Sequence, residues 1–149
     1  MGRSHARELT VARRPPASSA AVRKRMRATP QRDTPLELGL RSFLHGVGLR
    51  FRVHRQAVPG LRRTVDILFP KSRIAVFVDG CFWHGCPRHG TLPKTTNRQW
   101  WTEKIRTNQR RDRDTDRKMR RLGWRVIRVW EHEDQQIAAR RIAKLVKSQ

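Results

Sequence analysis

The hydrophobic positions of the chain follow several different spacings, and the first clear one is helical. Thr34 and Glu37 form a capping box, and Pro35 suits the first position of a helix. Gly46 and Gly48 end the pattern, so we expect a helix from Thr34 to about Gly46. Its predicted apolar face comprises Leu36, Leu40, Phe43, Leu44 and Val47.

Three short segments with strand character follow this helix. Residues 49–54 alternate apolar and basic side chains, whereas residues 65–69 and 74–78 are mostly apolar. A tight turn at residues 70–72 joins the last two segments, so together they predict a β-hairpin. The run at 74–78 has no polar face and is therefore expected near the centre of a sheet.

A long helix, a strand and a final helix are expected in the C-terminal part. They cover about Asn97 to Gly123, then residues 124–130, then residues 133–147, where Ile137, Ile142 and Val146 form an apolar face. One face of the long helix is apolar at its ends and polar in its middle, which predicts a hydrated site at its centre. This face comprises Trp101, Ile105, Asn108, Asp112, Thr115, Met119 and Leu122. The order of elements predicts an α/β fold around one mixed sheet.

The charge of the chain narrows the class of partner. The 149 residues include 35 Lys and Arg against 12 acidic residues, a net charge of +23. Such an excess is typical of proteins that bind nucleic acid, because each neutralised phosphate releases a condensed counterion. Residues 1–32 hold nine of the basic residues and one acid, and predict an arm that is largely disordered until DNA is bound. Residues 33–149 then form one domain.

The apolar runs and the cysteines indicate the compartment. The longest apolar run, Ile74 to Val78, is far shorter than the roughly 20 residues of a membrane span, and no signal-peptide pattern is visible. Two cysteines close together argue against a disulfide scaffold. We therefore expect a cytoplasmic monomer, associated with the nucleoid when it binds DNA.

Residues 79–89 gather the soft metal ligands of the chain. Cys81 and Cys86 are separated by four residues, and His89 follows shortly after. This density predicts a loop ordered by a metal, with two free buried thiols as the alternative. Phe82 and Trp83 lie between the cysteines and are expected to be presented on the loop.

Two carboxylates on the predicted hairpin indicate catalysis. Asp66 lies in an apolar strand, where a carboxylate is costly unless it is paired or binds a metal, and Asp79 ends the neighbouring strand. The hairpin would bring both close enough to share one Mg²⁺, which can activate water for phosphodiester hydrolysis. His84 adds a general acid or base. The alternatives are that Asp66 pairs with a nearby arginine, that Asp79 only begins a turn, and that Glu37 only caps its helix.

At these residues the chain resembles a known family, the very short patch repair (Vsr) mismatch endonucleases. The resemblance runs from about residue 23 to residue 133, and its most specific part is Gly-Cys-Phe-Trp-His-Gly-Cys at residues 80–86. The flanking motifs occur in order: Met26-Arg27-Ala28, Arg32-Asp33-Thr34, Glu37, Pro59-Gly60, Asp66, Val76–Asp79, Trp101, Lys104-Ile105, Asn108, Arg111-Asp112, Gly123–Val126 and Val129–Glu131.

The resemblance implies both a fold and an activity. The fold would be restriction-endonuclease-like and related to the PD-(D/E)xK nucleases, with helices around a mixed sheet and a zinc-bound loop. The activity would be Mg²⁺-dependent nicking of duplex DNA beside a T:G mismatch, which arises from deamination of 5-methylcytosine. By this match Asp66 holds Mg²⁺, His84 assists proton transfer and Glu37 orders a metal-bound or attacking water.

The same resemblance assigns DNA-binding residues. Phe82 and Trp83, with Met26 from the arm, would wedge between base pairs at the mismatch, where unstacking costs least. Arg27 and Arg111 are expected on the DNA as well.

A structural zinc is also implied, on Cys81, Cys86, His89 and His132. His132 stands where the family usually has a cysteine, and His84 competes with His89 as the third ligand. Val78 and Asp79 stand where some members have Thr-His, so Asp79 is either a second magnesium ligand or a neighbour with some metal contact. The metal aspartate follows Thr64-Val65, without the proline common in such nucleases.

Two other functions fit parts of the pattern. One is an endonuclease of the same fold directed at modified cytosine or restriction-associated sites. The other is a non-catalytic zinc module that binds DNA, which leaves Asp66, Asp79 and His84 without a shared purpose. The expected partner is duplex DNA with a T:G mismatch, and mismatch-repair proteins and a cytosine-5 methyltransferase system are further candidates.

Overall fold

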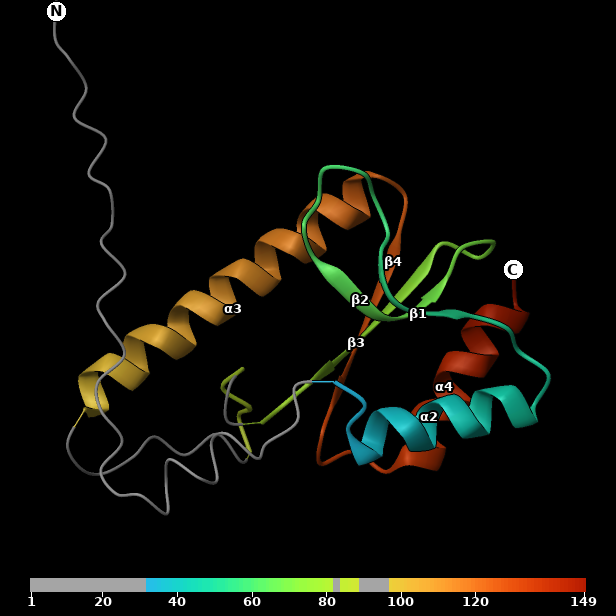
Figure 1. Ribbon diagram of the computed structural model, residues 1–149, viewed down its shortest axis with the longest axis horizontal. Helices are drawn as coiled ribbons and strands as arrows, with labels where there is room; N and C mark the ends of the chain where they lie inside the picture. Colours follow the sequence, from blue (N-terminus) through green and yellow to red (C-terminus); the bar gives the residue numbers. More distant parts are fainter. Residues whose placement is uncertain (1–31, 82–83, 89–96) are drawn as a thin grey trace, which may run out of the picture.

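The computed structural model describes residues 32–81, 84–88 and 97–149 (Figure 1). Within them, four strands form one sheet in the order β1–β2–β3–β4. β1 pairs antiparallel with β2, β2 antiparallel with β3, and β3 parallel with β4. The strands are Arg52–Gln56 (β1), Thr64–Phe69 (β2), Ile74–Asp79 (β3) and Arg125–Trp130 (β4).

The helices cover the two faces of this sheet. α2 (Pro35–Gly46) and α4 (Gln135–Lys147) lie together on one face, and α3 (Arg98–Arg121) lies on the other, as Figure 1 shows. A parallel connection between neighbouring strands needs a crossover, and α3 supplies it between β3 and β4. The result is a three-layer α/β arrangement that places the end of β3 beside the middle of α3.

The apolar residues form one core on each face of the sheet. The larger core joins α2 and α4 to the sheet, and the smaller one joins Met119 of α3 to it. The larger core includes Leu40, Leu44, Ile67, Ile74, Val76, Val129 and Ile142, all fully buried. β3 contributes to both cores, which explains why its sequence lacks a polar face.

The order and type of every predicted element are confirmed for the described residues, and the predicted α/β sheet flanked by helices is present. Thr34 caps α2 as predicted, because Glu37 N donates to Thr34 Oγ1 at 3.3 Å. The return bond of the predicted capping box is displaced by one residue, since the Glu37 side chain accepts from Asp33 N at 3.2 Å and not from Thr34 N. The first strand, however, begins at Arg52, since Leu49 and Phe51 pack against the core before the pairing starts.

Two residues lie outside the apolar faces on which the spacing predicts them. Leu122 is 51% exposed because α3 ends at Arg121 and the chain turns at Gly123, whose φ is 86°. Ile137 is 66% exposed, since it lies in the first turn of α4 beside the capping Asp134.

Several predicted features lie outside the described residues: Met26, Arg27, Phe82, Trp83, His89 and all but the last residue of the 1–32 arm. Among the described helices, none is both long enough and apolar enough to cross a membrane.

Candidate functional site

The hairpin of β2 and β3 brings Asp66 to the end of β3. Ile67 pairs with Val76, and one residue further along the ladder the Asp66 side chain replaces a backbone partner: Val78 N donates to its Oδ2 at 2.7 Å. Asp66 therefore lies beside the residue that precedes Asp79, as the predicted hairpin requires. The two carboxylates nevertheless belong to different groups of side chains.

Asp66 is partly buried, with little positive charge near it. Its side chain is 20% exposed, and within the described residues its one ion-pair partner is His54, whose Nδ1 lies 3.8 Å from Oδ1. Burial raises the pKa of Asp66 to about 6; the Val78 hydrogen bond and His54 oppose this shift, while the charges of Glu37 and Asp79 add to it. A carboxylate in such surroundings gains from a bound cation.

The Glu37 carboxylate lies close to Asp66, with the His54 imidazole between them. Glu37 is 2% exposed, and its Oε2 accepts from Arg41 Nη2 at 3.0 Å and from Asp33 N at 3.2 Å. His54 Nε2 lies 3.7 Å from this oxygen, so one imidazole separates Glu37 from Asp66. The first turn of α2 thus lies close to Asp66, as a role of Glu37 beyond capping requires.

Arg41 and His54 are members of this group that the sequence did not single out. Arg41 Nη2 lies 2.9 Å from His54 Nε2, and Arg41 Nη1 donates to Asp33 Oδ1 at 2.7 Å. The backbone of His54 is left-handed (φ 49°), a conformation that costs energy for a residue other than glycine and is common at functional sites. Histidine in an alternating strand gave no signal of this geometry.

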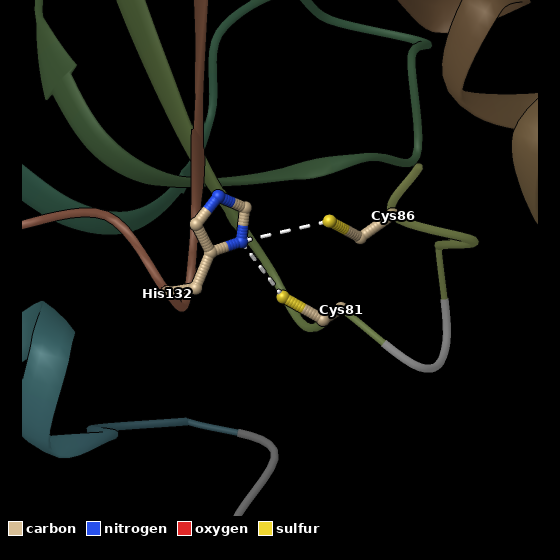
Figure 2. A group of neighbouring side chains, drawn as sticks. All are labelled: Cys81, Cys86 and His132. Carbon is tan, nitrogen blue, oxygen red and sulfur yellow. Dashed lines mark hydrogen bonds between the residues drawn. The ribbon is translucent and has the colours of Figure 1, made fainter. Parts of the chain in front are cut away.

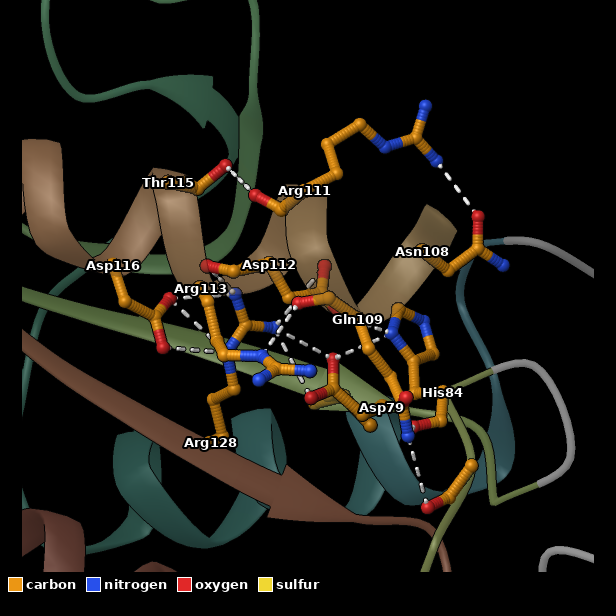
Figure 3. A network of polar contacts seen from close by, with 12 residues as sticks. Asp79, His84, Asn108, Gln109, Arg111, Asp112, Arg113, Thr115, Asp116 and Arg128 are labelled. Carbon is orange, nitrogen blue, oxygen red and sulfur yellow. Dashed lines mark hydrogen bonds and ion pairs between the residues drawn. The ribbon is translucent and has the colours of Figure 1, made fainter. Parts of the chain in front are cut away.

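Asp79 and His84 belong to a second group, which Figure 3 shows between β3 and α3. His84 Nδ1 lies 2.5 Å from Asp112 Oδ2 and 3.8 Å from Asp79 Oδ1. Burial works against the charged imidazole, but the Asp112 hydrogen bond and the charges of Asp79 and Asp112 outweigh it, so the pKa of His84 is raised. Burial likewise opposes the charged Asp112, yet His84, Arg128 and Arg63 lower its pKa.

Asp112 shows that the polar middle of α3 faces other polar side chains, those of His84, Arg63 and Arg128. The sequence placed it on the right face but did not pair it with His84. The signal was present, because a carboxylate with Asn108 and Thr115 on an otherwise apolar face needs polar partners.

Arg128 binds the carboxylate of Asp79. Its Nη1 donates to the two Asp79 oxygens at 3.0 and 3.1 Å, and Asp79 is 3% exposed. Burial raises the pKa of Asp79, and the charges of Arg128 and His84 offset this only in part. The sequence did not identify Arg128; a charged residue in the middle of a strand was the available signal.

The loop that carries His84 is held against α3. Gly85 has φ 65°, and a side chain there would collide with Gln109 Nε2 and with Ile105. Gln109 Nε2 also donates to the carbonyl oxygen of His84 at 3.3 Å. Glycine at this position of the Cys-Phe-Trp-His-Gly-Cys segment therefore permits the close approach that orients His84.

Cys81, Cys86 and His132 converge at a separate point (Figure 2). His132 Nδ1 lies 3.2 Å from Cys81 Sγ and 3.5 Å from Cys86 Sγ, and both cysteines are buried and free of disulfides. Burial and the neighbouring Cys86 raise the pKa of Cys81 to about 11 in the absence of a cation. Two thiols and one imidazole within 4.8 Å of one another suit a soft divalent metal such as Zn²⁺.

The remaining site residue of the described chain is Arg111. It is exposed on α3, and its Nη2 donates to Asn108 Oδ1 at 3.1 Å. It therefore lies on the helix that carries Asp112, one residue before it.

The described residues thus combine a partly buried carboxylate, Asp66, with an imidazole–carboxylate pair, His84 and Asp112. Residues 18–89 match the family described as DNA mismatch endonuclease Vsr. The chain is 44% identical over 126 residues to the type II nicking enzyme V.NaeI of Lentzea aerocolonigenes, covering 83% of this chain and 75% of the relative. The chain therefore belongs to the Vsr family and is a DNA endonuclease, a hydrolase of phosphodiester bonds.

Two further relatives show the same relationship. The type II nicking enzyme V.XorIIP of Xanthomonas oryzae pv. oryzae is 44% identical over 110 residues, 72% of this chain and 77% of the relative. The DNA mismatch endonuclease Vsr of Escherichia coli (strain K12) is 41% identical over 108 residues, 72% of this chain and 67% of the relative. The predicted family is thus confirmed, and a purely non-catalytic module is not supported.

Proposed function

We propose that this endonuclease nicks one strand of duplex DNA beside a T:G mismatch and uses Mg²⁺ held by Asp66. The observation that carries the proposal is the state of Asp66. It is a partly buried carboxylate with a raised pKa, and among the described residues no Lys or Arg forms an ion pair with it. A hard divalent cation that brings phosphate oxygens and water completes such a site well.

The bound Mg²⁺ would supply charge neutralisation at the phosphate and a more acidic water. The residues of the chain then share the remaining roles. Asp112 holds Nδ1 of His84, which leaves Nε2 to exchange a proton with the reacting oxygens. Glu37, linked to Asp66 through His54, lies where it can order a water beside the cation.

A structural Zn²⁺ is proposed on Cys81, Cys86 and His132, with His89 as the fourth ligand. The three described ligands fit the ion by type and by spacing. His84 is occupied by Asp112, which favours His89 over His84 for the remaining position. The ion would join the end of β3 to the segment after β4.

DNA contacts complete the proposal. Phe82 and Trp83, with Met26, would wedge into the base stack, and Arg27 and Arg111 would contact the strand. The residues on each side of the aromatic pair are anchored: Cys86 N donates to Cys81 O at 2.9 Å, and His84 N to Gly80 O at 3.2 Å. A wedge needs such a fixed base, because unstacking a base step costs a few kcal/mol.

A nicking assay tests this function. T:G-mismatched, fully matched and hemimethylated duplexes of one sequence are compared with Mg²⁺, and nicking of the T:G duplex alone is expected. Equal cleavage of all three would overturn mismatch specificity. Asp66→Asn should lose the Mg²⁺-dependent product while it keeps DNA binding; wild-type nicking by this variant would overturn the assignment of Asp66.

A second candidate function follows from the names of the relatives. Several are called type II nicking enzymes, so a nicking site defined by sequence or cytosine methylation, without a mismatch, is the alternative. The same three duplexes distinguish it, because preferential nicking of matched or hemimethylated DNA would favour this alternative. A cytosine-5 methyltransferase and mismatch-repair proteins are proposed partners in either case.

A further inference from the structure

Arg128, on β4, lies at the centre of a group of carboxylates that come from β3 and α3 (Figure 3). Asp79 comes from the end of β3, Asp112 and Asp116 from α3, and Arg128 itself from β4. The guanidinium is held on every side: Nη1 by both oxygens of Asp79, Nε by Asp116 at 3.1 Å, and Nη2 by Asp116 at 2.6 Å and by the Asp112 carbonyl at 3.4 Å. It also lies 4.5 Å from the Phe77 ring centroid.

The position of this guanidinium is one that suits a metal ion. Ligand atoms of Asp79, His84 and Asp112 all lie within 4.8 Å of one another, a spacing that a divalent cation can bridge. Arg128 Nη1 lies 3.0 Å from Asp79 Oδ1 and 3.8 Å from Asp112 Oδ1, between the two carboxylates. The positive charge of the side chain therefore stands where a second cation would otherwise be attracted.

The charges of the group balance without an ion. The three carboxylates of Asp79, Asp112 and Asp116 face three groups that can carry positive charge, Arg128, Arg63 and His84. On the Asp66 side, the three carboxylates of Asp66, Glu37 and Asp33 face one arginine, Arg41, and one imidazole, His54. Among the described residues, no Lys or Arg forms an ion pair with Asp66 itself. A divalent ion thus has much to gain at Asp66 and little at Asp79.

We infer that Arg128 is a positioning residue that replaces a second divalent cation, so that the nuclease centre holds a single catalytic ion, at Asp66. The inference rests on the proposed role of Asp66 and extends it to the number of ions. It also explains why Asp79 is buried here, because Asp79 fixes Arg128 and does not ligate the metal. With Arg128 in place, Asp112 stays bound to His84 and is not drawn to an ion.

Counting bound Mn²⁺ tests the inference without reference to activity. Protein-bound Mn²⁺ is obtained from the EPR signal of free Mn²⁺, with equimolar Zn²⁺ present to occupy the thiols. Arg128→Met should bind one Mn²⁺ more than the wild type, because it leaves Asp79, His84 and Asp112 without the guanidinium. Arg128→Lys, which keeps the charge, and the double variant Asp79→Asn/Arg128→Met, which removes both partners, should bind the wild-type number.

Two results would overturn the inference. One is the same Mn²⁺ count for Arg128→Met and the wild type. The other is the loss of an ion in Asp79→Asn alone, which would make Asp79 a ligand. If Arg128→Met is only marginally stable without metal, its melting temperature should rise more steeply with Mn²⁺ than that of the wild type. The absence of such a rise would equally contradict the replacement.

The metal-binding role of Asp66 and the role of Arg128 are tested by different variants, so one can be wrong while the other holds. Asp66→Asn should lose the ion that the wild type binds, and retention of that ion would remove the assignment of Asp66. The role of Arg128 is still decided in that case, because it depends only on the difference in bound Mn²⁺ between Arg128→Met and the wild type.

Discussion

Asp66 and Asp79 lie at the same end of neighbouring strands, and Asp79 is buried while Asp66 is partly buried. Their surroundings differ as well. Asp79 receives two hydrogen bonds from Arg128 and lies close to His84. Asp66 receives one backbone hydrogen bond, and the carboxylate of Glu37 is among its neighbours. The protein itself balances the charge of Asp79, whereas Asp66 has no Lys or Arg partner among the described residues, and we propose that a bound cation balances its charge.

Under the proposed assignment of Mg²⁺ to Asp66, this difference accounts for selective metal binding at one end of the sheet. Burial alone raises the pKa of both carboxylates, so burial does not distinguish them. The distinction comes from a single arginine on β4, which satisfies one carboxylate and lies away from the other. The position of a metal ion therefore depends on its own ligands and also on positively charged side chains that occupy neighbouring carboxylates.

Removal of the Asp66 carboxylate should have the largest effect on catalysis. Asp66→Asn is expected to lower the nicking rate by about 10³-fold or more, since metal activation of water is worth several kcal/mol. Single-turnover nicking of a T:G duplex in Mg²⁺ measures the loss. Asp114→Asn on the exposed side of α3 is a matched control, and an equal loss there would point to a general effect of charge.

Breaking the balanced pair should cost the most stability. Arg128→Met leaves Asp79 buried without its main partner, and a loss of about 3–5 kcal/mol in the free energy of unfolding is expected. Urea denaturation in EDTA measures it. The double variant Asp79→Asn/Arg128→Met should recover the part of that loss that comes from Asp79. A double variant as unstable as the single one would mean that Arg128 stabilises the fold through Asp116 or through packing on Phe77 instead.

The orientation of His84 should matter less than the metal. Asp112→Asn is expected to slow nicking about 10- to 100-fold, less than the roughly 10²–10⁴-fold expected for His84→Ala. Rates of the two single variants and the double variant form a cycle. Because Asp112 acts through His84, adding Asp112→Asn to His84→Ala should change the rate little, and a full additional loss would contradict that link.

The smallest expected effect is a change of stability with pH. The pKa of Asp66 is about 6 in the folded state against an ordinary value of 3.8, so the folded state holds the proton more tightly. Stability from this group is full below about pH 4 and is lost as pH rises through 6. Without metal, Asp66→Asn should therefore be more stable than the wild type at pH 8 by roughly 1–2 kcal/mol, a gain that disappears near pH 4.

Urea denaturation at the two pH values, with EDTA present, provides the measurement. Added Mg²⁺ should narrow the difference at pH 8, because it stabilises the wild type alone. A variant that is less stable than the wild type at pH 8 would show that Asp66 contributes a structural contact that outweighs its burial.

The local pattern of the sequence determined the order of helices and strands, the cap of α2 and the hairpin, because each depends on neighbouring residues. The same pattern showed that α3 has a polar centre and that the residues after β3 carry soft ligands. The pattern was wrong at two helix ends. Leu122, just after α3, and Ile137, in the first turn of α4, extend the apolar spacing beyond the residues whose side chains face the core.

Only the tertiary structure decided which charged residues pair with one another. Arg128 is 49 residues from Asp79, and Asp112 is 28 residues from His84, so each pair depends on the register of β3 with β4 and on where α3 crosses the sheet. His54 and Arg41 lie near Asp66 because β1 pairs with β2 and α2 packs on the same side of the sheet. Sequence spacing specifies which face a residue occupies, but a buried charge is stabilised by whichever partner the packed elements bring to it, and that choice distinguishes Asp66 from Asp79.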